Sequence, residues 1–217
     1  MKGDSIVIED HHLKAAKQIV SVLLPMINNS EGKFALNVAG ESGSGKSEIA
    51  TAIANELERE GIRSVLLQQD DYFVYPPKTN DRTRRKDINW VGPQEVHLDV
   101  MDQNIRDILD GAKEIEKPLV IYEEDSITRE TISAGDVKVI IADGTYTTLL
   151  KNLTARTFID RTFTDTRKHR ERRMRDASEL DEFIDKVLEI EHRIISSHKP
   201  TADLIISKDY EVSRNTK

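Results

Sequence analysis

The sequence of 217 residues contains no cysteine. This absence excludes disulfide-rich scaffolds, cysteine-ligated zinc, iron–sulfur clusters and thiol catalysis, and it is consistent with a reducing compartment. Long apolar runs are also missing, since the longest, at residues 19–24 and 137–142, are far too short to cross a bilayer. No basic and apolar signal segment opens the chain. We therefore expect a cytoplasmic protein that does not contact a membrane.

Positive charge is in deficit, with 32 Lys and Arg residues against 39 Asp and Glu residues and a net charge of −7. This balance argues against general nucleic-acid binding. The basic residues gather in two places: residues 161–175 hold seven of them against two acidic ones, and residues 78–86 hold five. Local basic patches on an acidic protein suit the binding of a small anion. The second patch either binds an acceptor phosphate or is a solvated loop, and charge runs are usually solvated.

Strand and helix patterns alternate along the chain. Short apolar runs predict strands at residues 34–39, 62–67, 119–122, 128–132, 137–142, 157–159 and 204–206. Helical spacing predicts helices that start near Asp10, Lys46, Pro93 and Ser178. This alternation predicts an α/β fold, with a parallel sheet covered by helices on both faces. We expect a leading helix within residues 1–32, packed on a single domain over residues 33–217.

Individual residues predict where some of these elements begin and end. Asp10 is a candidate cap for the first helix, and Pro25 is expected to kink or end it. Residues 70–93 are expected to form a long polar loop. Ser178 and Asp181 have the spacing of a capping box for the last helix. The adjacent His11 and His12 are interpreted as a solvated helix start.

A phosphate-binding motif follows the first predicted strand. The pattern G-x-x-x-x-G-K-[ST] is matched in full by Gly40, Glu41, Ser42, Gly43, Ser44, Gly45, Lys46 and Ser47. Its glycines let the backbone curl, so that successive N–H groups point at phosphate oxygens at the positive end of the next helix. Lys46 would reach the β- and γ-phosphates, and the Ser47 hydroxyl would ligate Mg²⁺. The motif predicts a nucleoside triphosphate with Mg²⁺ and leaves ATP or GTP open.

Carboxylates follow two of the predicted strands. Asp143 ends an apolar run and precedes Gly144, which is typical of a second Mg²⁺ ligand or of a turn; beside a phosphate-binding loop the metal role is favoured. Asp70 and Asp71 follow another strand at the edge where open α/β sheets bind ligands. One of the two would take a proton from an acceptor hydroxyl while lying near the metal. The alternative for this pair is a solvated acidic turn.

These motifs resemble, in order and spacing, the group of P-loop small-molecule kinases that contains uridine kinase, phosphoribulokinase, pantothenate kinase and nicotinamide riboside kinase. The resemblance runs from about residue 34 to 207. It is carried by residues 40–47, 69–73, 143–144, 165–167, 172–176 and 199–206. It implies a three-layer P-loop NTPase fold with an Arg-rich helical lid at about residues 161–178. It also implies transfer of the γ-phosphoryl group of ATP to a hydroxyl of a small-molecule metabolite.

The resemblance also implies roles for individual residues. Asp70 falls on the catalytic base of the group and Asp143 on its metal-side carboxylate. Lys46, Arg167 and Arg172 would act in phosphoryl transfer, and the lid residues Arg173 and Arg175 would contact the ATP phosphates. The candidates for acceptor binding are Asp71, Tyr72, Trp90, Tyr122 and Arg129.

The acceptor region departs from the uridine kinase pattern. The aspartate that holds the ribose hydroxyls in uridine kinases falls on Val91, and their pyrimidine-binding histidine falls near Ile127. An isopropyl group cannot replace a carboxylate that hydrogen-bonds a substrate without a large loss of discrimination. Trp90 beside it is either a core anchor or a stacking surface for the acceptor. We therefore expect uridine to be a poor acceptor.

Two other functions share the phosphate-binding motif. One is a nucleotide-switched binding module, although the N-K-x-D and L-S-G-G-Q segments of common switch and transport ATPases are absent. The other is a toxin-like kinase that acts on a sugar nucleotide and also has a basic lid. The acceptor, the oligomeric state and the role of the leading helix stay open at this point.

Overall fold

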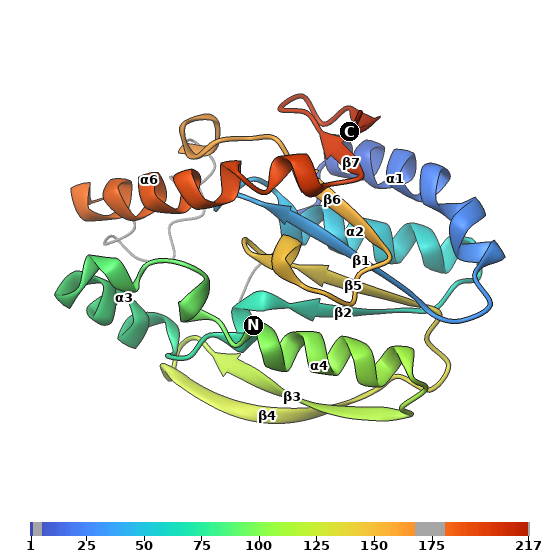
Figure 1. Cartoon of the computed structure of the whole chain (residues 1–217), viewed down its shortest axis with the longest axis horizontal. Helices are drawn as coiled ribbons and strands as arrows, with labels where there is room; N and C mark the ends of the chain where they lie inside the picture. The colour runs from blue at the N-terminus through green and yellow to red at the C-terminus, as the bar shows by residue number, and fades with distance from the viewer. Residues whose placement is uncertain (2–5, 168–180, 217) are drawn as a thin grey trace.

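The computed structural model describes residues 1, 6–167 and 181–216. A mostly parallel sheet forms the centre of the molecule, helices cover both of its faces, and a two-stranded hairpin lies outside it (Figure 1). The predicted α/β fold is confirmed. Within these residues no helix combines the length and the hydropathy that crossing a membrane requires.

The elements have the following bounds. The strands are β1 (Phe34–Gly40), β2 (Ser64–Gln68), β3 (Glu114–Ile121), β4 (Ser126–Ser133), β5 (Val139–Asp143), β6 (Ala155–Ile159), β7 (Leu204–Ile206) and β8 (Val212–Arg214). The helices are α1 (Asp10–Asn29), α2 (Lys46–Arg59), α3 (Pro77–Lys86), α4 (Leu98–Leu109) and α6 (Glu182–Ser196). Short 3₁₀ turns are η1 (Gln69–Tyr72), η2 (Ile88–Trp90), η3 (Pro93–Glu95), η4 (Thr147–Leu149) and η6 (Lys199–Thr201).

The central sheet has the order β2-β5-β1-β6-β7-β8, with parallel pairs except for β7 and β8. Alternate side chains of β1 enter different cores, as the pleat of a strand requires. Phe34, Leu36 and Val38 pack beneath α1 and α2, whereas Ala35 and Ala39 join the core that contains α4 and the inner side of α6. Both faces of β1 are therefore fully buried.

Helix α1 continues through Pro25 to Asn29, so of the two expected effects of this proline, a kink or an end, the helix does not show the end. Proline removes the hydrogen bond to the carbonyl of Ser21, but both residues are exposed, so water can replace that bond. The N-cap is Glu9, with Asp10 as the first helical residue.

Residues 70–93 do not form a long loop, because η1, α3 and η2 occupy most of the segment. The polar sequence of this segment wrongly indicated a loop, because α3 has almost no apolar side and its one buried residue is Asn80. Ion pairs hold this helix instead. They join Arg82 to Asp125, Arg84 to Glu95 and Glu191, and Arg85 to Asp81 and Asp181. The basic patch at residues 78–86 is thus largely neutralised within the protein.

Other boundaries differ in smaller ways. Pro93 opens the turn η3, and α4 starts five residues later at Leu98. Asp181 is the N-cap of α6 and accepts a hydrogen bond from the backbone N–H of Ile184, so it does not occupy the third helical position of a capping box. Ser178 lies outside the described residues.

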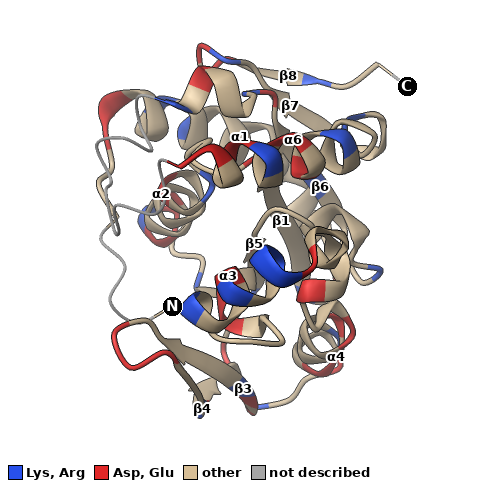
Figure 2. Cartoon of the chain, turned by 90° about the vertical axis from the view of Figure 1, so that its left-hand side faces the viewer, with Lys and Arg blue, Asp and Glu red and all other residues tan. Residues whose placement is uncertain are grey.

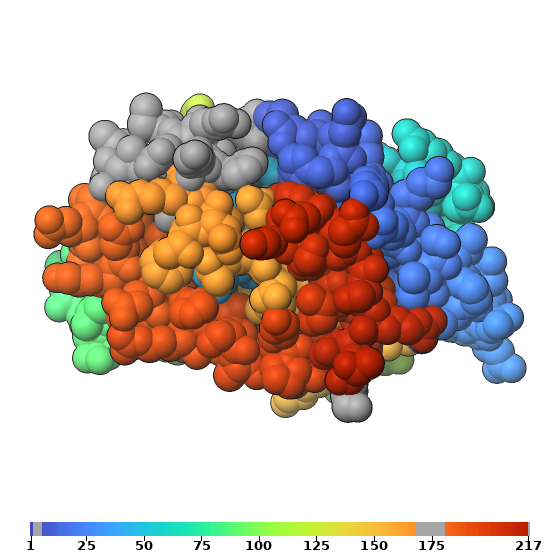
Figure 3. Space-filling view, turned by 90° about the horizontal axis from the view of Figure 1, so that it is seen from above, coloured from blue at the N-terminus to red at the C-terminus, as the bar shows by residue number. Residues whose placement is uncertain are grey.

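The C-terminal segment adds an antiparallel strand, β8, that no sequence pattern predicted, since its residues, Val-Ser-Arg, form no apolar run. It lies against α1, where the Gln18 side chain accepts a hydrogen bond of 2.8 Å from the backbone N–H of Val212 and Lys14 pairs with Glu211. Figure 3 shows the C-terminal residues next to α1 on this side of the molecule. The C-terminal segment thus extends the sheet by one edge strand and fixes α1 against it.

A buried amide connects the central strand to its neighbours. Asn37 of β1 accepts a hydrogen bond from the backbone N–H of Thr157 at 2.9 Å, and its own amide donates to the Thr147 hydroxyl at 3.2 Å. We expect Asn37→Ala to lower the free energy of unfolding by about 1–3 kcal/mol, because buried polar groups lose their partners. Urea unfolding would measure this. Asn28→Ala, at an exposed position of α1, is the control, and an equal effect of both substitutions would contradict the assignment.

Candidate functional site

The phosphate-binding motif and the two strand-end carboxylates meet at one edge of the sheet. Val38 of β1 and Gln68 of β2 both pair with Asp143, so the three strands end side by side. A pocket of about 110 Å³ lies at this edge. It is lined by Met1, Ser42, Gly43, Lys46, Ser47, Gln68, Gln69, Asp70, Asp143, Gly144 and Thr145. Figure 2 views the molecule from this side, with α3 and α6 flanking the strand ends.

The motif itself forms the tight loop that the sequence predicts. Gly45 caps α2 in the left-handed conformation, with φ of 95°, which favours glycine. A β-carbon there would lie 3.0 Å from Nε2 of His12 and 3.1 Å from the Tyr210 hydroxyl, so the loop also needs the missing side chain. Lys46 follows at the start of α2 and donates a hydrogen bond of 2.9 Å to the carbonyl of Glu41 across the loop. The lysine ammonium is thereby held over the motif.

Asp143 is buried at the end of β5, and its Oδ1 atom has no hydrogen-bond partner within residues 6–167 and 181–216 or in Met1. Burial raises the pKa of Asp143 to about 7; a hydrogen bond from Ser47 opposes the rise, and the charge of Asp70 adds to it. An unpartnered buried carboxylate oxygen beside a serine hydroxyl and a second carboxylate is an oxygen-rich set of the kind that Mg²⁺ binds. The residues present therefore fit this ion: Ser47 and Asp143 would be its ligands, and Asp70 lies nearby.

Asp70 is positioned by its neighbour Gln69. The Gln69 side chain accepts a hydrogen bond of 2.6 Å from the backbone N–H of Tyr146, which follows Asp143 by three residues. This contact requires Gly144, because a β-carbon at that position would come within 2.2 Å of the Gln69 β-carbon. The turn after β5 and the turn after β2 are thus locked together. Asp70 is left half-buried on the pocket wall.

Asp71 points away from this pocket into a buried ion pair. Its Oδ2 atom lies 2.7 Å from Nζ of Lys117, and its Oδ1 atom accepts a hydrogen bond of 3.1 Å from the backbone N–H of Val120. The α-amino group of Met1 lies 3.1 Å from the same Oδ1. The contacts of Asp71 therefore tie η1 to the β3–β4 hairpin.

Tyr72 and Trp90 face different parts of the molecule. Tyr72 is fully buried, and its hydroxyl donates a hydrogen bond of 3.0 Å to Asn104 of α4. Trp90 is half-buried, donates from Nε1 to Asn80 at 2.8 Å, and lies tilted against Tyr75 with ring centres 5.5 Å apart. Of this pair, Trp90 keeps ring surface available to a ligand.

Two of the candidates for acceptor binding, Tyr122 and Arg129, belong to the β3–β4 hairpin. Tyr122 lies beneath the ammonium group of Lys78, 5.7 Å from the ring centre. Arg129 pairs with Glu116 of the neighbouring strand, and 76% of its side chain is exposed.

The start of the predicted lid contacts the phosphate-binding loop directly. The Glu41 carboxylate accepts a hydrogen bond of 2.6 Å from the backbone N–H of Phe163, and the Thr166 hydroxyl donates to the carbonyl of Ser42 at 3.0 Å. Arg167 follows and is exposed. The predicted lid residues Arg172, Arg173 and Arg175 lie outside the described residues.

Arg84, from the basic patch at residues 78–86, forms a buried polar group near the site with three residues that the sequence analysis did not select: Glu95, Tyr146 and Glu191. Arg84 makes a bidentate ion pair with Glu95, at 2.5 and 2.6 Å, and approaches Glu191 of α6 at 3.3 Å. The Tyr146 ring is buried beside them, and burial together with the charges of Glu191 and Glu95 raises the pKa of its hydroxyl. One signal was available, since Glu191 interrupts the buried apolar stripe of α6 formed by Val187, Leu188 and Ile195.

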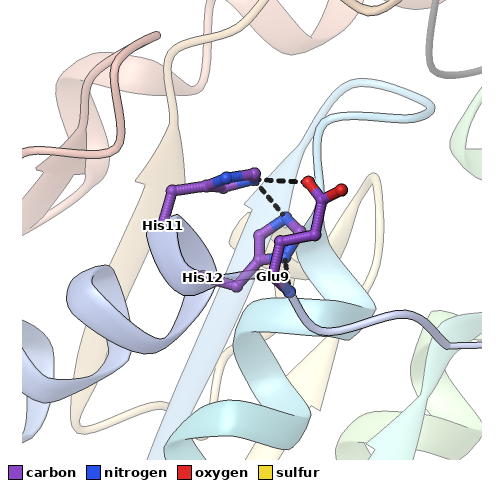
Figure 4. Close-up of side chains that lie close together, drawn as sticks. All are labelled: Glu9, His11 and His12. Atoms are coloured by element: carbon purple, nitrogen blue, oxygen red, sulfur yellow. Dashed lines mark hydrogen bonds and ion pairs between the residues drawn. The ribbon is translucent and has the colours of Figure 1, made fainter.

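The histidines at the start of α1 also lie near the phosphate-binding loop. His12 is buried, so the expectation of a solvated pair is wrong for this residue. Figure 4 shows Glu9, His11 and His12 close together, with 3.1 Å between the two Nε2 atoms. Nδ1 of His12 accepts a hydrogen bond from the backbone N–H of Glu9, which leaves the ring proton of a neutral imidazole on Nε2. That tautomer does not offer Nε2 to a metal ion, so the geometry supports a hydrogen bond between the rings.

Comparisons with known proteins find relatives of this chain. Residues 35–168 match the phosphoribulokinase and uridine kinase family. The chain is 26% identical over 196 residues to the bifunctional α-galactosidase/sucrose kinase AgaSK of Mediterraneibacter gnavus, covering 85% of this chain and 21% of that protein. It is 32% identical over 165 residues to uridine-cytidine kinase B of Dictyostelium discoideum, covering 74% and 65%.

A solved structure shares the fold. A possible uridine kinase from Bacillus stearothermophilus superposes with a TM-score of 0.63 at 16% identity, covering 88% of this chain and 97% of that one. The chain spans about a fifth of the first curated relative and 65% of the second.

The Asp71 contacts lead to a stability prediction. Removal of Lys117 leaves a buried carboxylate without its side-chain cation, and breaking a buried pair costs about 3–5 kcal/mol. We expect Lys117→Met to lower the free energy of unfolding by that amount in urea titrations. Arg129→Ala on the same hairpin removes an exposed ion pair and should change it by less than about 1 kcal/mol. A Lys117→Met protein as stable as Arg129→Ala would show that Asp71 is held by other contacts.

Proposed function

The chain belongs to the phosphoribulokinase and uridine kinase family, and on this premise we propose that it is an ATP-dependent kinase that phosphorylates a hydroxyl group of a small molecule. One observation carries the proposal. The half-buried Asp70 stands close enough to the buried Asp143 to raise its pKa, on the wall of the pocket that Lys46 and Ser47 also line. A phosphate-binding loop alone supports nucleotide binding, whereas this additional carboxylate supports transfer to an acceptor.

Each residue of the pocket has a part in the proposed reaction. Lys46 and the backbone N–H groups of the loop bind the triphosphate, and Ser47 and Asp143 hold Mg²⁺. When bound, Mg²⁺ neutralises charge on the phosphate oxygens. Asp70 accepts the proton of the acceptor hydroxyl as the oxygen forms its bond to the γ-phosphorus. The bond from that phosphorus to the β–γ bridging oxygen breaks, and ADP leaves.

We extend the proposal to the basic segment. Phe163 and Thr166 connect its start to the phosphate-binding loop, so movement of this segment and binding of phosphates would be coupled. Arg167, Arg172, Arg173 and Arg175 would close over the triphosphate as a lid at about residues 161–178. Guanidinium groups suit the oxygens of the transferring phosphoryl group because they bind in a forked geometry. A cytoplasmic location and the absence of nucleic-acid binding stay predictions.

Product formation tests the proposed function most broadly. The protein would be incubated with Mg·ATP and pooled acceptors that include nucleosides, saccharides, pantothenate, glycerate and pentose phosphates. Release of ADP together with a phosphorylated acceptor, identified by mass spectrometry, is the expected result. ATP binding with no phosphorylated product from any acceptor would favour a nucleotide-switched binding module and contradict the kinase.

Asp70→Asn provides the sharpest variant. A positioned base contributes about 10²–10⁴-fold to the rate, so kcat should fall by that factor while ATP affinity, measured by calorimetry, stays close to that of the wild type. Asp107→Asn, on α4 and distant in sequence from the strand ends, is the matched control. A kcat near the wild-type value in Asp70→Asn would remove this residue from the proposed mechanism.

Uridine is expected to be a poor acceptor. Val91 occupies the position of the ribose-binding aspartate and is buried, so no carboxylate from this position meets the ribose hydroxyls. Steady-state kinetics with uridine and cytidine would measure the effect. A kcat/KM for uridine of about 10⁵ M⁻¹s⁻¹, within the ordinary range for enzymes with their own substrates, would contradict this prediction.

A further inference from the structure

The buried polar group formed by Arg84, Glu95, Glu191 and Tyr146, here called the Arg84 cluster, has unbalanced charge. Glu95 is fully buried and takes both hydrogen bonds of the bidentate pair with Arg84. Glu191 is a second carboxylate on the same guanidinium, at 3.3 Å. The described part of the cluster therefore contains two carboxylates and one cation. A single pair of Arg84 and Glu95 would hold α3 to η3 without the additional carboxylate.

The hydroxyl of Tyr146 provides a second, independent observation. The residue is 1% exposed, and its hydroxyl has no hydrogen-bond partner among the described residues. Buried hydroxyl groups are nearly always paired in folded proteins, and each exception calls for an explanation. The hydroxyl lies within the field of both carboxylates of the cluster. It is thus a buried hydrogen-bonding group near the carboxylates of Glu191 and Glu95, without a partner among the described residues.

The cluster lies beside the transfer site. The backbone N–H of Tyr146 is bound by Gln69, the neighbour of Asp70. On the other side, His192 follows Glu191 and contacts the carboxylate of Glu41 in the phosphate-binding loop at 2.6 Å. The side chain of Glu191 is 10% exposed and that of Arg84 is 16% exposed, so the cluster is buried but not sealed. An acceptor held at Asp70 would meet this cluster through the exposed part of Glu191.

The chemistry of the cluster selects the kind of molecule. A carboxylate accepts hydrogen bonds from hydroxyl groups, and a tyrosine hydroxyl both donates and accepts them. The cation of the cluster is already engaged by two carboxylates. Of the neighbouring arginines of α3, Arg82 pairs with Asp125 and Arg85 with Asp81 and Asp181. Each of these arginines is thus already paired with carboxylates of the protein, so an acceptor with a phosphate or carboxylate group would have to compete for them.

We propose that Glu191 and Tyr146 form a binding site for the hydroxyl groups of an uncharged polyhydroxylated acceptor, a saccharide or polyol, whose reacting hydroxyl lies at Asp70. This assignment rests on the proposed kinase function and defines its substrate class. Arg84, which is itself paired with Glu95, holds the carboxylate of Glu191 in place. Glu191 and Tyr146 bind the acceptor, and Asp70 alone takes its proton.

The first experiment compares acceptor classes. Wild-type protein with saturating Mg·ATP would be assayed for phosphorylated product with neutral saccharides and polyols, with nucleosides, and with anionic acceptors such as glycerate and pentose phosphates. The assignment expects the highest kcat/KM within the neutral saccharide and polyol panel. An anionic acceptor or a nucleoside with the highest kcat/KM would overturn the assignment and leave the kinase function intact. ATP binding without any phosphorylated product would overturn both.

Two substitutions then test the residues with the preferred saccharide. Tyr146→Phe and Glu191→Gln should each raise the KM for this acceptor at least tenfold, while the KM for ATP changes less than twofold. Glu189→Gln, at an exposed position one half-turn away on α6, should change neither constant. Calorimetric titration of the saccharide into each protein gives the same comparison without turnover.

The role of the cluster in stability is separated from binding by Tyr146→Phe. Its hydroxyl has no partner in the described chain, so this substitution should not lower the melting temperature even if Glu191→Gln does. An acceptor KM within twofold of the wild type in a folded Tyr146→Phe protein would show that the hydroxyl does not contact the acceptor, and would overturn the assignment.

Discussion

The arrangement depends on the close approach of two carboxylates, Asp70 and Asp143, at the ends of neighbouring parallel strands. Two negative charges near each other on the wall of a pocket repel one another, and burial of Asp143 adds to the cost of its charged form. A magnesium ion and the ammonium group of Lys46 would offset both effects. The site is therefore electrostatically incomplete until a cation and a phosphate chain enter it together, which couples binding of the metal to binding of the nucleotide.

The surrounding fold holds this strained pair in place through a small number of polar contacts. Gln69 joins the turns after β2 and β5, and Gly144 leaves room for this contact. Glu41 connects the phosphate-binding loop both to Phe163 at the start of the basic segment and to His192 of α6. The donor side and the acceptor side of the pocket thus share a residue of the same loop.

The sequence predicted those parts of the site that depend on residues adjacent to one another along the chain. The motif at residues 40–47 and the strands that precede Asp70 and Asp143 could be predicted because a short apolar run and the loop that follows it carry their own signal. Helix α3 could not be predicted, because charged pairs rather than an apolar face hold it. Nor could the partner of Asp71, since Lys117 lies on a hairpin 46 residues away along the chain. The pairing of Arg84 with Glu191 joins residues 107 positions apart, and no local pattern reports it.

The coupling of metal and nucleotide is measured most directly by calorimetric titration of ATP into the wild type and into Asp143→Asn, each with and without Mg²⁺. The account predicts that Mg²⁺ strengthens ATP binding to the wild type and that Asp143→Asn loses at least tenfold of this gain, about 1.4 kcal/mol. Without the metal, the variant should bind ATP at least as tightly as the wild type, because one negative charge has been removed. An equal gain from Mg²⁺ in both folded proteins would contradict the central role of this carboxylate pair.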